Sequence, residues 1–123
     1  MKNSTAICPA PVHRMEIWLA KLPEVPGHVQ HGRRPVIVVS SDSNNAKSSV
    51  ITVVPLTSNR VAPTQQTHGL TVVSIAKCEQ VMALDKCCLV RRVGEVSGWY
   101  DRLAIQHALA LQLGIEMQVN LAA

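Results

Sequence analysis

The stretch Gly27 to Ser40, GHVQHGRRPVIVVS, decides the fold because it joins a polar loop to a strand that must be buried. The run from Val36 to Ser41 is apolar on both faces, which predicts a central strand. Pro35 restricts Arg34 to an extended conformation, so the arginine has a defined direction at the entrance of that strand. An arginine there can hold a phosphate through two N–H groups, although taken alone it would more often form a surface ion pair.

Apolar runs on either side of this stretch predict further strands. The expected strands are Glu16–Lys21, Val36–Ser41, Val50–Leu56, Leu70–Ala76 and Leu89–Val96, with Cys78–Met82 continuing or pairing beside the fourth. Pro55 favours a strand end or an edge position, since proline cannot donate to a neighbouring strand. Gly94 indicates a bulge in the last strand. Asp42 is the expected cap of a turn or a single helical turn.

The pattern changes near the C-terminus, where one helix is expected. Ser97 is its predicted N-cap, and the helix would run from Trp99 to about Glu116 with Trp99 in the core. Five or six short strands and one helix predict a mainly β fold, a small curled antiparallel sheet or open barrel with the helix packed against it. Residues 1–13, which carry two prolines and no periodicity, are an expected flexible leader, and residues 14–123 a single domain.

The composition fits a folded chain that needs neither a metal nor a membrane. A chain of 123 residues, 47% of them hydrophobic, can bury roughly two-thirds of its unfolded surface. The formal charge of +4 fits an acidic partner, either nucleic acid or protein, and equally fits ordinary solubility. The four cysteines form no CxxC pair, which indicates reduced thiols in a cytoplasmic chain and argues against a zinc site. Because no run of 18 apolar residues occurs, we expect no membrane span.

Two more polar groups follow apolar runs. Thr57 and Ser58 come just after a predicted buried strand, where their hydroxyls could donate to a phosphoryl oxygen or simply cap a turn. Lys77 and Glu79 would share one face of an extended segment. That pair is either an ion pair at the rim of the sheet or part of a site.

Taken together and in this order, these blocks resemble the MazF/PemK (Kid) family of toxins from type II toxin–antitoxin systems. The blocks are GHVQHGRRPVIVVS (27–40), VVPLTS (53–58), CEQVMALDK (78–86) and RVGEVS (92–97). The resemblance runs from about Glu16 to Leu113, and the first block is its most specific part. It implies a PemK-like, SH3-like small barrel with a C-terminal helix that works as a homodimer.

The resemblance also implies an activity, sequence-specific and metal-independent cleavage of single-stranded RNA, including mRNA, without a cofactor. In this family the 2′-hydroxyl of the substrate attacks, which leaves a 2′,3′-cyclic phosphate and a 5′-hydroxyl end and inhibits translation and growth. The protein then has to supply positioning, proton transfer and charge stabilisation. A cognate acidic antitoxin is the implied partner, and it is expected to displace the loop at residues 23–34 in a cytoplasmic complex.

Matching positions imply the site residues. Arg34 would stabilise the developing charge of the phosphorane, and Thr57 would orient the scissile phosphate. Glu79 would act as the base, and the imidazole of His28 could share that work near neutral pH. The implied RNA contacts are Gln30, Arg33, Ser58, Lys77 and Gln80.

The chain departs from the family pattern at several positions. Met15-Glu16-Ile17 stands where Gly-Asp-Ile is common, so the glycine is lost while the charge is kept. Met82 and Ala83 replace an arginine and a threonine, and Lys77 replaces an arginine, which loses a two-pronged grip on phosphate. These changes predict weaker cleavage or an altered RNA preference, and they leave open an inactive relative.

Two other functions stay open from the sequence. A gyrase-inhibiting toxin of the CcdB type shares the fold, but that mechanism resembles one that needs a C-terminal Trp-Gly-Ile, whereas this chain ends in Asn120-Leu121-Ala122-Ala123. The departures at Lys77 and Met82 keep alive a non-catalytic barrel that binds RNA or protein.

Overall fold

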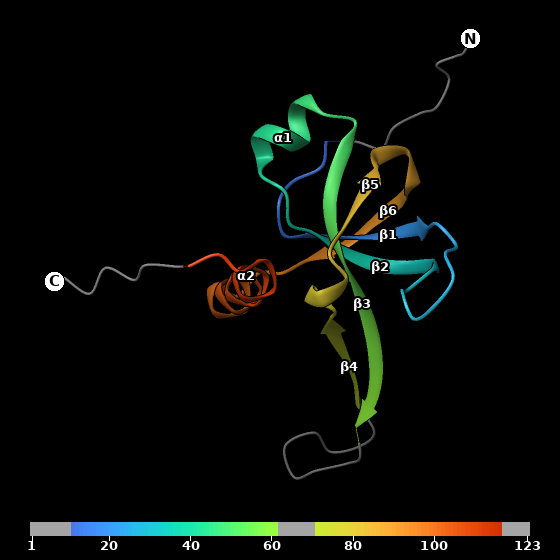
Figure 1. The fold of residues 1–123 in the computed structure, drawn as a ribbon, viewed down its shortest axis with the longest axis vertical. Helices are drawn as coiled ribbons and strands as arrows, with labels where there is room; N and C mark the ends of the chain where they lie inside the picture. The colour runs from blue at the N-terminus through green and yellow to red at the C-terminus, as the bar shows by residue number, and fades with distance from the viewer. Residues whose placement is uncertain (1–10, 62–70, 117–123) are drawn as a thin grey trace, which may run out of the picture.

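The computed structural model describes residues 11–61 and 71–116, and for residues 58–61 and 71–74 it describes the backbone only. In chain order the elements are β1 (Glu16–Leu22), β2 (Gly32–Val38), α1 (Asp42–Lys47), β3 (Val50–Val61), β4 (Thr71–Ala76), the 3₁₀ turn η1 (Cys78–Gln80), β5 (Met82–Asp85), the 3₁₀ turn η2 (Lys86–Cys88), β6 (Leu89–Glu95) and α2 (Trp99–Leu113). Figure 1 shows the strands crossing at the centre of the molecule, with α2 standing to one side.

The strands form one antiparallel sheet that curls back on itself. Its order is β4-β3-β2-β1-β6, and β5 pairs with the first half of β3. Since η2 joins β5 directly to β6, the two borders of the sheet lie close to each other (Figure 1). The expected mainly β fold, a curled antiparallel sheet with a C-terminal helix, is confirmed.

Alternation along the strands supplies two hydrophobic clusters, one on each face of the sheet. The inner core consists of Val12, Trp18, Ala20, Leu22, Val36, Val38, Ile51, Val53, Leu84 and Leu89. The helix-side core consists of Met15, Ile37 and Leu56, against which Ile17, Val39, Ala76, Val96 and Ile105 pack. Each fully buried valine or isoleucine stabilises the fold by roughly 1.5–3 kcal/mol relative to an exposed one, so these clusters hold the sheet in its curl.

Pro55 lies in the middle of a long central strand, so its predicted place at a strand end or edge was wrong. The structure accommodates it because β3 changes partners at this point. Residues up to Pro55 pair with β2, and residues from Leu56 onward pair with β4. A proline costs little where the ladder of one neighbour ends and that of the next begins.

Other boundaries differ in instructive ways. The second strand begins at Gly32 and so includes the two arginines, while the strand expected over Cys78–Met82 is the turn η1 followed by β5. The bulge expected at Gly94 is confirmed, because Ile17 pairs with Gly94 and Trp18 with Arg92, which leaves one extra residue on β6.

The two helices are capped by neighbours of the residues that were expected. The side chain of Ser41 accepts from the backbone N–H of Asn44 at the start of α1, whereas Asp42 is already helical. Gly98 is the N-cap of α2, and Gly114, with a φ of 68°, ends it in the left-handed conformation. The predicted burial of Trp99 was wrong, since 74% of it is exposed. It lies in the first turn of α2, a helix that packs mainly against η1.

The predicted flexible leader, residues 1–13, overlaps the first residues that the structure describes. Residues 1–10 are outside the described residues, and Val12 is packed in the inner core with 5% of its surface exposed. The boundary at residue 13 therefore stays a prediction.

Candidate functional site

Arg34 and Thr57 lie just beyond the same end of the ladder that pairs β2 with β3. The register pairs Val36 of β2 with Pro55 of β3, and Arg34 and Thr57 each lie two residues beyond that pair toward one end of the sheet. Since residues two apart on a strand share a face, both side chains leave the sheet on the face of Val36 and Pro55. Both are partly buried. This rim, the end of the β2–β3 ladder next to the point where the β1–β2 loop (residues 23–31) enters β2, can therefore present a guanidinium beside a hydroxyl.

The turn η1 is tied to the same rim through the backbone. The N–H of Lys77 donates to the carbonyl oxygen of Pro55 at 2.9 Å, which sets the start of η1 next to β3. The Nζ atom of Lys77 lies 4.0 Å from Oε2 of Glu79, and the two side chains are 35% and 56% exposed. The segment is not extended as predicted, yet the lysine and the glutamate still pair. An exposed ion pair of this kind contributes at most about 1 kcal/mol, so both groups can turn to a ligand at low cost.

The β1–β2 loop is held against the rim by two side chains. Oε1 of Gln80 accepts from the backbone N–H of Gln30 at 2.8 Å, and Nε2 of Gln80 donates to the carbonyl oxygen of His28 at 3.4 Å. Nε of Arg34 donates to the carbonyl oxygen of His31 at 3.1 Å. These bonds bring His28 and Gln30, predicted from a different part of the sequence, to η1.

The predicted residues thus gather around one rim, with two exceptions. Arg33 neighbours Arg34 on β2 and so leaves the sheet on the opposite face, where it lies opposite Lys21 of β1. Both residues also border a hollow of about 610 Å³, whose apolar lining includes Leu22 and Leu84 of the inner core. The side chain of Ser58 lies outside what the structure describes. No hydrogen bond or ion pair joins the described side chains of Arg34, Thr57 and Glu79 to one another.

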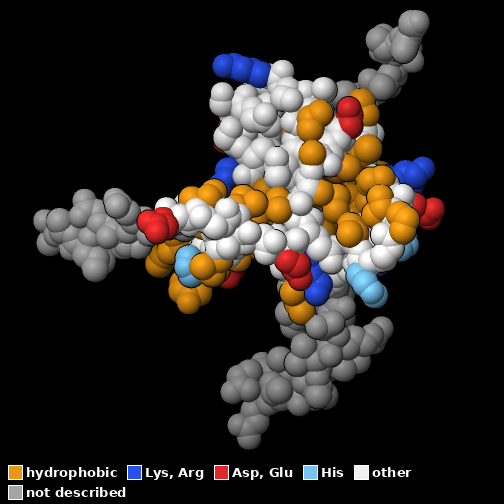
Figure 2. Space-filling view, in the orientation of Figure 1, with side chains coloured by type: hydrophobic (Ala, Val, Ile, Leu, Met, Phe, Trp, Pro, Cys, Tyr) orange, Lys and Arg blue, Asp and Glu red, His pale blue; other side chains and the backbone are white. Residues whose placement is uncertain are grey.

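The electrostatics of the turn leave its thiol protonated. Burial raises the pKa of Cys78, and the neighbouring carboxylate of Glu79 raises it further. A thiol of raised pKa is a weak nucleophile, so the site depends on its lysine, arginine, histidine and carboxylate groups. In Figure 2 acidic, basic and histidine side chains gather below the centre of the view. Within residues 11–61 and 71–116, no group of three histidine, cysteine, aspartate or glutamate residues is placed to hold a metal.

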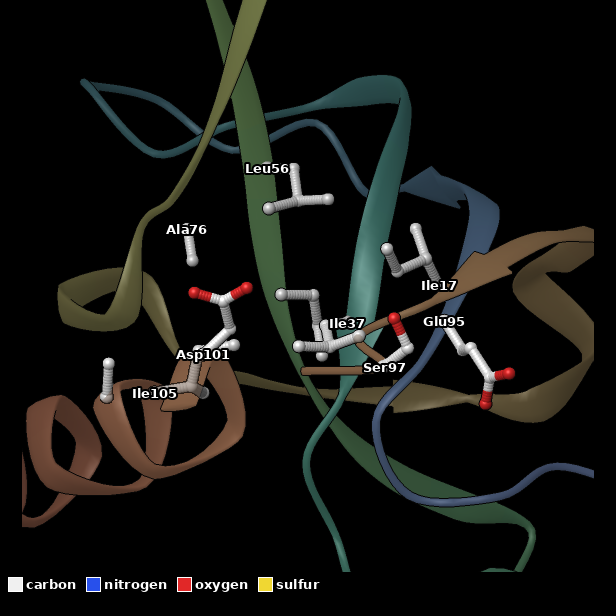
Figure 3. Close-up of a pocket in the computed structure, with 10 residues that line it drawn as sticks. Ile17, Ile37, Leu56, Ala76, Glu95, Ser97, Asp101 and Ile105 are labelled. Carbon is white, nitrogen blue, oxygen red and sulfur yellow. The ribbon is translucent and has the colours of Figure 1, made fainter. Parts of the chain in front are cut away.

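A second hollow, of about 430 Å³, lies between α2 and the sheet and contains none of the predicted site residues (Figure 3). Its wall is mostly the helix-side core, and Glu95, Ser97 and Asp101 supply its polar groups. Leu56 and Ala76, which line it, directly precede Thr57 and Lys77 in the chain. The hollow therefore lies behind the rim, on the side of the helix.

The sequence missed one functional arrangement, the bonds from Gln80 to the loop. Gln80 was predicted to contact RNA because of its place in the third block. The backbone groups that it bonds lie some 50 residues earlier in the chain. No local pattern signals such a contact. The sequence also gave no sign that the long helix would leave Trp99 and Tyr100 exposed, with their rings edge to face at 6.0 Å.

Known proteins are similar to this chain in both sequence and fold. A family model described as a PemK-like, MazF-like toxin of type II toxin–antitoxin systems matches residues 13–113. The endoribonuclease MazF9 of Mycobacterium tuberculosis is 36% identical over 116 aligned residues, covering 85% of this chain and 98% of the relative. The endoribonuclease PemK of Escherichia coli is 31% identical over 81 aligned residues, 60% of this chain and 61% of PemK.

Solved structures show the same architecture at lower identity. The crystal structure of MazF from Deinococcus radiodurans superposes with a TM-score of 0.65 at 21% identity, covering 87% of this chain and 100% of that chain. A mycobacterial endoribonuclease in complex with its cognate antitoxin gives 0.63 at 22% identity, covering 88% and 98%. These likenesses establish the fold.

In the described ranges, no helix has the length and apolar character needed to cross a membrane.

Proposed function

Because the chain belongs to the family of PemK-like, MazF-like toxins of type II toxin–antitoxin systems, we propose that it is a metal-independent, sequence-specific endoribonuclease that cuts single-stranded RNA. Cleavage of mRNA would inhibit translation and growth. The observation that supports this most directly is that the rim gathers Arg34 and Thr57 from two strands with Glu79 and the His28 loop, through the backbone bond of Lys77 and the bonds of Gln80.

The proposed reaction needs no nucleophile from the protein. The 2′-oxygen of the substrate attacks the adjacent phosphorus and gives its proton to the carboxylate of Glu79, while the bond from phosphorus to the 5′-oxygen breaks. The leaving 5′-oxygen takes a proton from the imidazolium form of His28. Arg34 stabilises the added negative charge of the phosphorane through its terminal N–H groups, and Thr57 orients the phosphate. The products are a 2′,3′-cyclic phosphate and a 5′-hydroxyl end.

RNA binding would rest on phosphate contacts that depend on salt. Lys77 and Gln30 lie beside the proposed reacting groups, and Arg33 would hold the strand on the other face of β2. Ser58, next to Thr57, is a further proposed contact, whereas the carboxamide of Gln80, expected from the resemblance to contact RNA, is bonded to the β1–β2 loop instead. Single-stranded bases can then splay over the rim and be read through their edges.

A second copy of the chain is the proposed partner of α2 and β6. The exposed apolar residues of these two elements are Val90 and Val93 on β6 and Trp99, Tyr100, Leu103, Leu111 and Leu113 on α2, each at least 43% exposed. Figure 2 shows hydrophobic side chains over α2. Exposed apolar side chains on a helix and on a strand at the edge of the described sheet are typical of an interface rather than of a monomer surface.

The remaining partner is an acidic cognate antitoxin in the cytoplasm. The cations at the rim, together with Arg33 and Lys21, would attract it, and the β1–β2 loop is the segment that it would displace. Solved relatives support this partner, since a Deinococcus radiodurans structure contains MazE with MazF.

One experiment tests the activity against both alternatives. Purified protein is incubated in EDTA with a long single-stranded RNA, and the ends of the fragments are mapped. Cuts at a recurring sequence that leave cyclic phosphate ends support the proposal. Inhibition of gyrase supercoiling without RNA cleavage would establish the CcdB-type function instead. If the protein shows neither activity, the non-catalytic binding barrel is the function that remains.

A further inference from the structure

The β1–β2 loop owes its place to polar contacts rather than to packing. Residues 23–29 are exposed, so no buried apolar side chain anchors them. Three backbone groups are held instead: the carbonyl oxygen of His28 and the N–H of Gln30 by Gln80, and the carbonyl oxygen of His31 by Arg34. A loop without a core contact moves as soon as such bonds are lost.

Glycines bound this held segment on both sides. Gly27 has a φ of 101° and Gly32 a φ of 78°, conformations that glycine adopts at little cost. A Cβ atom at either position would meet no described atom within 4 Å, so glycine is favoured there by the positive φ and not by a lack of space. The segment between them can therefore swing as a unit, and side chains decide where it stops.

We propose that Gln80 is a positioning residue whose carboxamide holds the β1–β2 loop in the place that the reaction needs. The proposal rests on the endoribonuclease function above. Gln80 acts on both proposed catalytic groups through the loop, because His28 is carried by the loop and Arg34 is bonded to it at His31. Loss of the clamp would shift the imidazole and free the guanidinium to rotate.

The chemistry of the clamp calls for a carboxamide of this length. One group must present an acceptor to an N–H and a donor to a carbonyl oxygen two residues earlier. A carboxamide carries the two on separate atoms of one planar group, whereas a hydroxyl must use a single oxygen for both. Asparagine is shorter by one methylene, and a carboxylate would lack the donor. Arg34 gives one N–H to the loop and keeps its remaining donors for a phosphate, so clamp and catalysis can coexist.

Two substitutions test the clamp. Gln80→Met keeps the length and volume of the side chain without its hydrogen bonds, and Gln80→Ala removes the side chain. The matched control is Gln106→Met, an exposed glutamine on α2. Hydrogen–deuterium exchange of the loop amides is expected to rise on the order of fivefold in both Gln80 variants and to stay unchanged in the control.

Kinetics on an RNA that carries the mapped cleavage site supply the second readout. For a positioning residue we expect kcat to fall about tenfold to a hundredfold with KM within about threefold of wild type. A rise in KM at unchanged kcat would mark Gln80 as a direct RNA contact and overturn the proposal, as would loop exchange equal to that of wild type. If the wild type cuts no RNA, the proposed function fails and the catalytic role of Gln80 with it, whereas exchange still reports separately whether the clamp holds the loop.

Discussion

The charged side chains near the two ends of β1 differ in how fully their hydrogen-bonding groups are satisfied. At its start, the Glu16 side chain is 11% exposed, and both of its oxygens accept hydrogen bonds: from the N–H of His13 at 2.8 Å, Nε1 of Trp18 at 3.1 Å and Nε of Arg92 at 2.9 Å. Near its end, opposite Ala20, the side chain of Arg34 on β2 makes a single hydrogen bond within the described chain, through Nε.

The difference separates groups that hold the fold from groups that are kept available. A buried carboxylate must have its oxygens satisfied, or its desolvation would destabilise the protein. The guanidinium of Arg34 has terminal N–H groups to spare at a partly exposed rim, which is what binding an outside anion requires. Changes at the first end should therefore affect stability, and changes at the second end should affect activity.

The strongest test of this contrast is Arg34→Ala. Loss of one preorganised charge donor should lower kcat/KM for RNA cleavage by about 10²–10³-fold. The melting temperature and the elution volume in size-exclusion chromatography should stay near those of wild type, and growth arrest on expression should disappear. Arg91→Ala, an exposed arginine on β6, is the control that should leave cleavage unchanged. Cleavage within twofold of wild type by Arg34→Ala would remove this residue from the mechanism.

At the other end, Glu16→Gln should lower the free energy of unfolding by about 2 kcal/mol, because it replaces charged hydrogen bonds by neutral ones. Urea denaturation measures this. The control is Glu95→Gln, whose exposed carboxylate lies 3.8 Å from Arg92 and 3.7 Å from Arg102 and should cost under about 1 kcal/mol. Equal losses in the two variants would contradict the contrast between buried and exposed ion pairs.

The loss of stability in Glu16→Gln is expected to depend on pH. Burial acts to raise the pKa of Glu16, but the hydrogen bonds from His13, Trp18 and Arg92 and the charge of Arg92 outweigh it, so the pKa is lowered. A carboxyl whose pKa falls on folding contributes its full stability above the unfolded pKa, about 4.3, and loses it as the pH drops through the folded value. The stability gap between wild type and Glu16→Gln should be constant near neutrality and close in acid.

The smallest expected effect concerns Met15, just before β1. Met15 is fully buried, yet its φ is 70°, a conformation that costs a non-glycine residue roughly 1–2 kcal/mol. Met15→Ala and Met15→Gly should both destabilise the protein because the buried side chain is lost. The glycine variant should be the more stable of the two by about 1 kcal/mol, the reverse of the usual order. Thermal unfolding measures the difference, and a more stable alanine variant would show that the backbone strain is absent.

Much of the fold could be predicted from local patterns. Four strands lie close to where apolar runs between turn residues placed them, because alternation and β-branched side chains act over a few residues, and the second overlaps its predicted range only at Val36–Val38. The helix was predicted for the same reason. The extended backbone of Arg34, which lies in β2, followed from Pro35 alone, since that restriction is a contact between adjacent residues. The predictions that Trp99 is buried and that Pro55 lies at a strand end or edge were wrong, because both properties depend on which elements pack or pair there.

The sequence by itself determined most strands, the helix and the identity of the polar groups at the rim, since each depends on neighbours within a few positions. It also determined the family, through the order and spacing of four short blocks. Only the tertiary structure decided that Gln80 reaches a loop 50 residues away, that Met15 takes a glycine-like φ, and that Arg33 and Arg34 part to opposite faces of a strand that includes them both. Those outcomes depend on where distant segments lie when the sheet curls, and that position is set by burial of the two hydrophobic clusters as a whole.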